Sequence, residues 1–258
     1  MAITQQLILT APPECCQRAA ESGLTVARLC YRVGKGGHLY RAELPGKRPG
    51  GLMGLCGGGF QGPGDPAQLC REIFRECINQ GLNGVLCDLE GEPSPFWENA
   101  LGLLGRGCAQ RGWALYVTEP FGDVTEQCRV LVSSLLSAGT LEGRLRTALA
   151  RYGEDRVALA AQRAMEDYTL PSAAGEGVRL TRAELAARMK RFSPSVFFDH
   201  GLCAHHFTYM ENSTAHFVLF DDCASLRRKL ALAGELGIRR AVLAYPEVED
   251  FLPQLVGR

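Results

Sequence analysis

The chain has 258 residues, of which 46% are hydrophobic and 22% are charged, a balance typical of globular proteins rather than disordered ones. Lys plus Arg and Asp plus Glu each number 28, so the formal net charge is zero, which argues against a general nucleic-acid binder. No apolar run approaches about 18 residues, so we expect no membrane span. The first residues lack a basic segment followed by a long apolar run, so we expect no signal peptide.

The hydrophobic pattern predicts short apolar strands that are mostly separated by helices. The predicted strands cover residues 6–10, 25–33, 52–56, 84–89, 113–118, 129–134, 156–161 and 240–245. The predicted helices cover residues 14–21, 65–79, 96–110, 140–152 and 222–236, and another begins at Thr181. Asp65-Pro66 and the pair Thr181 and Glu184 are typical N-terminal capping sequences. Residues 34–50 are glycine-rich and are predicted to form a hairpin or a loop.

This alternation predicts a single α/β domain over residues 1–258. Continuous apolar strands joined by helices indicate a parallel sheet that is buried on both faces. Eight such units in about 250 residues match a (β/α)₈ TIM barrel. The alternative is a doubly wound open sheet, which needs a phosphate-binding glycine loop where this chain has Ala11-Pro12-Pro13. Residues 195–221 are predicted to be a small β-rich insertion before the last helix, with a turn at Asn212-Ser213.

Two carboxyl groups stand at the end of the fourth predicted strand, in residues 83–90 (NGVLCDLE). Because side chains alternate along a strand, Asp88 and Glu90 share one face. The opposite face is apolar and should pack against the helices, so the two acids should face the carboxyl-terminal mouth of the barrel, where barrel active sites lie. Neighbouring carboxylates raise one pKa, which provides a neutral acid near pH 7. Alternatively, both side chains are simply solvated at the end of a strand.

The motif Gly-Val-x-x-Asp88-x-Glu90 resembles glycoside hydrolase family 18, in particular its branch of spore-germination and cortex-lytic hydrolases. Residues 55–58 (LCGG) stand where that family has Ser-x-Gly-Gly, and residues 207–222 and 225–238 resemble the branch's insertion and the helix leading into its eighth strand. The resemblance covers most of the chain. It implies hydrolysis of an N-acetylhexosamine glycan such as peptidoglycan or chitin by substrate-assisted catalysis. Glu90 would then be the general acid, and Asp88 would orient the acetamido group that attacks the anomeric carbon.

Several positions depart from the family pattern. Asn83 replaces the first aspartate of the motif, and Leu86 replaces its inner Asp or Asn. Residues 131–135 (LVSSL) lack the Tyr-Asp pair that binds the acetamido oxygen in the family, and residues 161–164 (AQRA) lack its Pro-x-Tyr. Tyr245 stands where the family has a tryptophan, and a tyrosine can also stack on a sugar.

Three further residues are candidates for substrate binding. Glu119 follows the fifth predicted strand and should lie at the mouth of the barrel. Glu166 and Tyr168 follow the seventh strand, as parts of an acidic and aromatic cluster. The alternative for this cluster is an ordinary solvated loop.

The 11 cysteines form an odd set without a CxxC pair. Most lie in apolar runs, so we interpret them as buried, reduced side chains of a cytoplasmic protein, with a place in the spore as the option that the resemblance suggests. A zinc site from Cys203, His205 and His206 is the alternative, but their spacing is tighter than in the usual zinc modules. We therefore expect neither a metal nor a cofactor.

Two functions remain open at this point. The first is a glycosidase whose partner is a carbohydrate substrate, and the retained Asp88-x-Glu90 favours it. The second is a catalytically degenerate barrel that binds a glycan or a protein partner, and the missing Tyr-Asp pair favours it.

Overall fold

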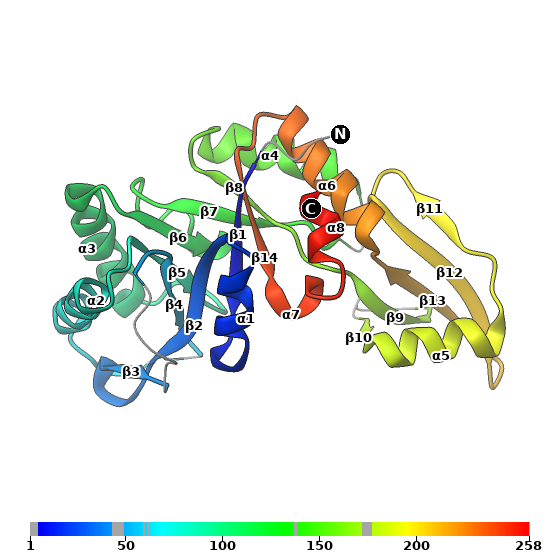
Figure 1. Ribbon diagram of the computed structural model, residues 1–258, viewed down its shortest axis with the longest axis horizontal. Coiled ribbons are helices and arrows are strands. Elements are labelled where there is room, and N and C mark those ends of the chain that lie inside the picture. The colour runs from blue at the N-terminus through cyan, green and yellow to red at the C-terminus, as the bar shows by residue number, and fades with distance from the viewer. Residues whose placement is uncertain are drawn as a thin grey trace.

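The computed structural model describes residues 5–42, 49–58, 60, 62–136, 139–171 and 177–257. Eight parallel strands form a closed ring in it (Figure 1). They are β1 (Gln6–Ala11), β2 (Thr25–Val33), β4 (Leu52–Cys56), β5 (Gly84–Asp88), β6 (Ala114–Thr118), β7 (Arg129–Ser133), β8 (Val157–Ala160) and β14 (Arg240–Ala244). Each strand pairs with the next, and β1 pairs with both β14 and β2. This closure confirms the predicted TIM barrel and excludes the doubly wound sheet, which has two free edges.

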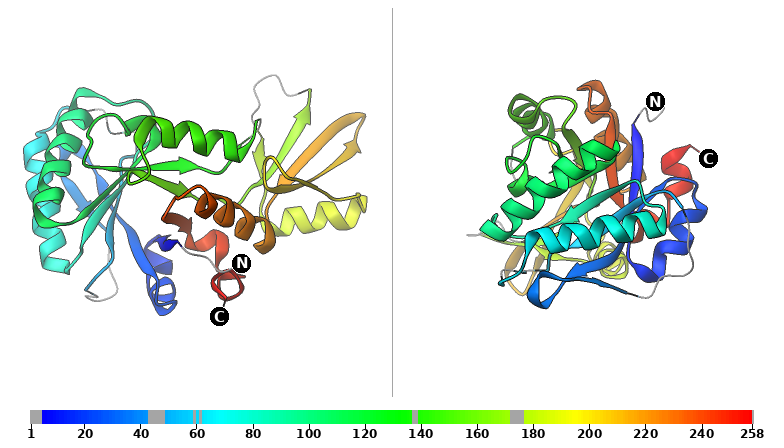
Figure 2. Two further views of the ribbon diagram at one scale, coloured as in Figure 1. Left: turned by 90° about the horizontal axis from the view of Figure 1, so that it is seen from above. Right: turned by 90° about the vertical axis from the view of Figure 1, so that its left-hand side faces the viewer.

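The barrel helices lie outside this ring, as Figure 2 shows. They are α1 (Cys16–Glu21), α2 (Pro66–Gln80), α3 (Pro95–Arg111), α4 (Leu141–Tyr152) and α6 (Cys223–Glu235), with the short α7 (Tyr245–Val248) and α8 (Leu252–Val256) after the last strand. The predicted cap of α2 is confirmed, because the Asp65 side chain accepts a hydrogen bond from the backbone N–H of Ala67 at 2.8 Å. The helix ends at Gly81, whose φ of 67° suits a residue without a side chain.

Strand alternation divides the core into two layers. Each barrel strand contributes one buried residue to the interior cluster, which consists of Ile8, Ala27, Leu52, Leu86, Tyr116, Leu131, Ala158 and Val242. Their neighbours in sequence point outward and pack against the helices; Val85 and Cys87, for example, are fully buried there. The strand ends above the interior cluster are therefore the positions at which polar side chains can face a cavity.

The segment that is predicted to form a hairpin or a loop, residues 34–50, is only partly described. It contains a short turn and β3 (Leu39–Arg41), which pairs antiparallel with the last residues of β2. Residues 43–48 lie outside the described part of the chain.

A second, five-stranded antiparallel sheet lies between β8 and α6 in the sequence and to one side of the barrel in space (Figure 1). Its strands are β9 (Met165–Leu170), β10 (Val178–Arg179), β11 (Phe197–Asp199), β12 (Ala204–Glu211) and β13 (Thr214–Phe220), and α5 (Arg182–Phe192) packs on one face. The turn at Asn212-Ser213 joins β12 to β13, with positive φ at both residues. The predicted range of residues 195–221 was too narrow, because β9, β10 and α5 belong to the same unit. Residues 166–168 form part of β9, not a loop, since β9 pairs with β13.

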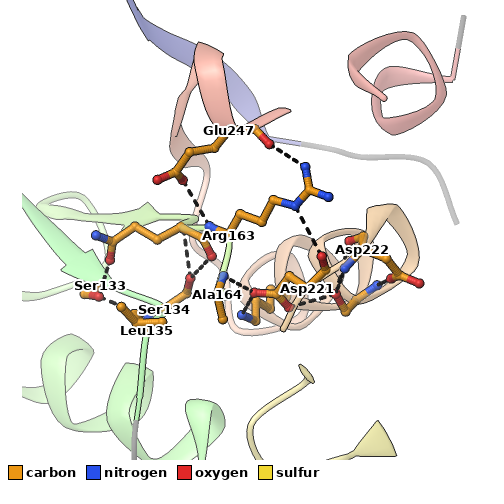
Figure 3. Close-up of polar contacts among 11 residues, drawn as sticks. Ser133, Ser134, Leu135, Arg163, Ala164, Asp221, Asp222 and Glu247 are labelled. Atoms are coloured by element: carbon orange, nitrogen blue, oxygen red, sulfur yellow. Dashed lines mark hydrogen bonds and ion pairs between the residues drawn. The ribbon is translucent and has the colours of Figure 1, made fainter. Parts of the chain in front are cut away.

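A polar junction joins this sheet to the barrel (Figure 3). Asp221, which follows β13, accepts hydrogen bonds from the backbone N–H of Ala164 at 2.7 Å and from the hydroxyl of Ser225 at 2.7 Å, and it pairs with Lys229 of α6 at 2.6 Å. Arg163 donates a hydrogen bond from Nε to the carbonyl oxygen of Asp221 and another from Nη1 to the carbonyl oxygen of Glu247. The chain therefore enters and leaves the insertion through one hydrogen-bonded cluster.

Candidate active site

A cavity of about 790 Å³ opens at the carboxyl ends of the barrel strands. Its acidic lining residues are Asp88, Glu92, Glu119 and Glu247. Its other polar residues are Thr10, Thr118, Ser133, Arg144, Arg151 and Gln162. Leu86, Leu131 and Val242 of the interior cluster form the apolar floor. A concave site with an apolar floor and convergent polar groups at this end of a TIM barrel is the usual place for catalysis.

Asp88 is the last residue of β5, and its side chain reaches the cavity because it lies two positions beyond Leu86. Its backbone carbonyl accepts a hydrogen bond from the N–H of Gly57 at 3.0 Å, which holds the ends of β4 and β5 together. The carboxyl group remains accessible to solvent, but the surrounding barrel wall and the negative charge of Glu90 both raise its pKa, the wall having the larger effect.

Glu90 lies beside Asp88 but faces a different hollow. This small depression, of about 20 Å³, is also lined by Gly57, Phe60 and Trp97. The Trp97 indole N–H donates to the carbonyl oxygen of Phe60 at 3.1 Å, so the tryptophan is fixed at the rim. Glu92 borders both the depression and the main cavity. It is not among the sequence-predicted residues, because it lies beyond the alternating segment that ends at Glu90.

β4, the third strand of the barrel, brings a thiol close to Asp88. Cys56 is opposite Asp88 in the β4–β5 register, and burial together with the charges of Asp88 and Glu90 raises the pKa of its thiol. The next residue is glycine; a Cβ at Gly57 would lie 2.3 Å from the end of the Leu89 side chain, which would have to move. Glycine at this position lets Leu89 pack closely against the end of β4.

Glu119 lines the cavity as expected, but it is ion-paired. The Arg144 guanidinium donates to its carboxylate and, through Nε, to the carbonyl oxygen of Ser133 at 3.2 Å. Arg151, two turns further along α4, pairs with Asp123. The helix that follows β7 thus places two cations at the edge of the cavity.

Ser133 and Gln162 are cavity residues that the sequence analysis did not select. Ser133 ends β7 and Gln162 follows β8, so both side chains point toward the cavity at adjacent strand ends. The Ser133 hydroxyl donates to Oε1 of Gln162. Both residues stand at the ends of predicted strands, and this position was a signal that they could face the cavity. Serine and glutamine occur in many roles, however, so the residue type alone does not identify them as site residues.

Besides Glu90, which faces the small depression instead of the barrel mouth as expected, three sequence-predicted site residues do not line the cavity. Tyr168 and Glu166 are on β9, where the Tyr168 hydroxyl donates to the Glu166 carboxylate. Tyr245 is 8% exposed and packs into the outer core, because Ala244 faces the cavity and the next residue faces the opposite way. As the structure stands, it offers no ring surface for a sugar to stack on in this cavity.

The proposed alternative zinc residues have other partners. His205 lies 3.3 Å from Asp222, and the ring of His206 stacks between those of Phe197 and Phe217. Within the described ranges, no group of three or more His, Cys, Asp and Glu residues is arranged to hold a metal ion. None of the described helices is long and apolar enough to cross a membrane.

Comparison with known proteins gives structural neighbours but no sequence relative. No protein-family model matches the chain, and no curated protein sequence matches it significantly. Among solved structures, a chitinase from Chromobacterium violaceum has a TM-score of 0.74 at 14% identity, over 98% of both chains. The spore cortex-lytic enzyme SleL of Bacillus cereus has a TM-score of 0.70 at 15% identity, covering 94% of this chain and 71% of the enzyme.

The closed ring of eight parallel strands defines a (β/α)₈ barrel, and the cavity lies at the end of the barrel where such folds carry their active sites. More particularly, the chain is similar in fold to barrels of glycoside hydrolase family 18: an N-acetylglucosaminidase of that family from Paenibacillus barengoltzii has a TM-score of 0.70 over 98% of both chains, at 11% identity. At such identities the likeness is one of fold.

Proposed function

We propose that this protein is a glycoside hydrolase that acts on an N-acetylhexosamine-containing glycan, such as peptidoglycan or chitin. The observation that carries the proposal is the pair Asp88 and Glu90 at the mouth of the barrel. Asp88 reaches the cavity, and its raised pKa is due partly to the charge of Glu90 beside it. Paired carboxyl groups in different surroundings are the chemistry that glycoside hydrolysis requires.

In the proposed mechanism, Glu90 donates a proton to the glycosidic oxygen as the bond between this oxygen and the anomeric carbon breaks. The carbonyl oxygen of the substrate's acetamido group attacks the anomeric carbon, and Asp88 accepts a hydrogen bond from the acetamido N–H. A water molecule then attacks the same carbon and gives a proton to the Glu90 carboxylate, which restores the acid. The sugar leaves with its acetamido group intact.

The decisive experiment compares purified variants for release of reducing sugar from chitin and from peptidoglycan. Glu90→Gln should lower the rate at least about 100-fold, because the side chain can no longer donate the proton. The matched control is Glu142→Gln, an exposed acid paired with Arg146 on α4, which should leave the rate unchanged. Activity that survives Glu90→Gln but disappears in Glu92→Gln would move the acid to Glu92 and contradict the assignment.

The second candidate function is glycan or partner binding without turnover. Two observations favour it: Leu86 fills the barrel interior at 2% exposure where the resembled motif has Asp or Asn, and Glu90 faces the small depression instead of the main cavity. This function predicts that calorimetry detects binding of chitooligosaccharides while no product appears.

We further propose that the protein acts in the cytoplasm or in the forming spore. All 11 cysteines have free thiols, and nine of them are buried. Such thiols remain stable in a reducing compartment. Fractionation of sporulating cells with an antibody against the protein tests this location.

A further inference from the structure

The side chain of Gln162 is fixed at the cavity by its neighbours. Its backbone N–H donates to the Ser134 hydroxyl at 3.0 Å and to the carbonyl oxygen of Ala160 at 3.1 Å, so the position of the residue is set by β7 and β8. Its Oε1 accepts the hydroxyl proton of Ser133. Among the residues that the structure describes, none accepts a hydrogen bond from its Nε2.

The Ser133 hydroxyl also determines which end of the carboxamide faces the cavity. The backbone N–H of Leu135 donates to Oγ of Ser133 at 3.0 Å, which leaves the hydroxyl proton free to bond to Gln162. With Oε1 occupied in this way, the amide nitrogen is the atom left for a ligand. Gln162 therefore offers two neutral N–H donors to the cavity.

Asp88 supplies the complementary group on another wall of the same cavity. Its strand, β5, is separated from β8 by β6 and β7 in the ring, and its carboxyl group has no hydrogen-bond donor among the described residues. A cavity that holds a free amide donor and a free carboxyl acceptor matches a secondary amide, which presents a carbonyl oxygen and an N–H.

The two arginines at the cavity edge are less suitable for a neutral carbonyl. Arg144 is paired with Glu119, and Arg151 is paired with Asp123. A guanidinium is matched best by a carboxylate, which each arginine already has.

We infer that Gln162 donates a hydrogen bond to the carbonyl oxygen of the substrate's acetamido group, and that Ser133 is the positioning residue that orients the carboxamide. This inference rests on the proposed function and assigns the acetamido specificity of that site to two residues. It explains how the site recognises an N-acetyl group although residues 131–135 (LVSSL) lack the Tyr-Asp pair of the resembled family.

The test measures binding of the N-acetylglucosamine trimer and of the glucosamine trimer by titration calorimetry at neutral pH. The wild-type protein should prefer the acetylated trimer. Gln162→Glu has the same shape but presents oxygens in place of the N–H donors, so it should lose at least about tenfold of this preference and gain affinity for the cationic glucosamine trimer.

Two further variants separate the donor from the fold. Gln162→Leu should weaken binding of the acetylated trimer only, and Ser133→Ala should lower the preference by a smaller factor because the donor remains but is no longer oriented. Thermal unfolding of each variant establishes that it is folded. A structural role alone would lower the affinity for both trimers equally.

The possible outcomes are distinguishable. If folded Gln162→Glu keeps the wild-type preference, the inference is overturned while the proposed hydrolase function stands. If the wild-type protein neither binds nor cleaves either trimer or the polymers, the proposed function fails and the inference fails with it. If the preference for the acetylated trimer changes with the residue at position 162, the result supports both the inference and the proposed function.

Discussion

Asp88 is a charged group that folding places in unfavourable surroundings. The barrel wall and Glu90 raise its pKa above the ordinary value of an aspartate, so the folded protein binds this proton more tightly than the unfolded chain does. The contribution of Asp88 to stability is therefore greatest below the ordinary aspartate pKa, and it falls as the pH rises through the folded value. An ionisable group that is kept in surroundings unfavourable to its charge is typical of a functional site.

Replacing Asp88 with asparagine should accordingly increase stability. At pH 7 we expect Asp88→Asn to raise the free energy of unfolding by less than about 1 kcal/mol, because the carboxyl group is accessible to solvent. The gain should shrink as the pH is lowered toward 4. Denaturant unfolding over this pH range checks the prediction, with Asp123→Asn, an exposed ion-pair partner of Arg151, as the control without a gain. A loss of stability in Asp88→Asn would contradict it.

Among the secondary-structure elements, α6 carries a buried charge that connects the barrel to the insertion. Lys229 is 1% exposed, and its partner Asp221, which follows β13, is also buried. Such a pair adds little net stability, but a charge left without its partner is costly.

Lys229→Met should therefore lower the free energy of unfolding by about 3–5 kcal/mol, because the Asp221 carboxylate loses its cation in a buried place. The neighbouring Arg228 is the matched control: it pairs with Glu235 at the surface, so Arg228→Met should cost less than about 1 kcal/mol. Chemical denaturation of the two variants measures both values. Equal losses would show that the burial of the Lys229 pair is unimportant.

At the scale of the whole molecule, Arg163 ties the insertion to the end of the barrel chain. Arg163 donates hydrogen bonds to the carbonyl oxygens of Asp221 and Glu247. In addition, its Nη1 pairs with the Asp250 carboxylate at 3.0 Å, and its guanidinium lies over the Phe251 ring. One side chain thus contacts Asp221, where the chain leaves the insertion, and the segment that joins α7 to α8.

Removing this side chain should loosen the insertion without unfolding the barrel. We expect Arg163→Met to speed amide hydrogen exchange in residues 165–220 by about tenfold or more, while exchange in β4 to β6 stays at the wild-type rate. The control Arg146→Met removes an exposed pair with Glu142 and should change neither region. Uniformly faster exchange would instead indicate that Arg163 stabilises the molecule as a whole.

Much of the barrel could be predicted from the sequence because its signals are local. The strand from Thr25 to Val33 has the predicted bounds, and Asp65 and Thr181 cap helices as expected. The insertion was harder, because β9 pairs with β10 and with β13, and β13 lies some fifty residues further along the chain. Its acidic start at Glu166 is equally typical of a loop.

By itself, the sequence determined the eight apolar strands and the position of Asp88 and Glu90 at the end of one of them, since alternation and capping depend on residues only a few positions apart. The tertiary structure alone decided what shares the cavity with Asp88. Ser133 and Gln162 meet because β7 and β8 are neighbours in the ring, and Tyr245 turns away because its predecessor faces inward. Such contacts depend on pairing and register between distant segments, which a local pattern does not carry.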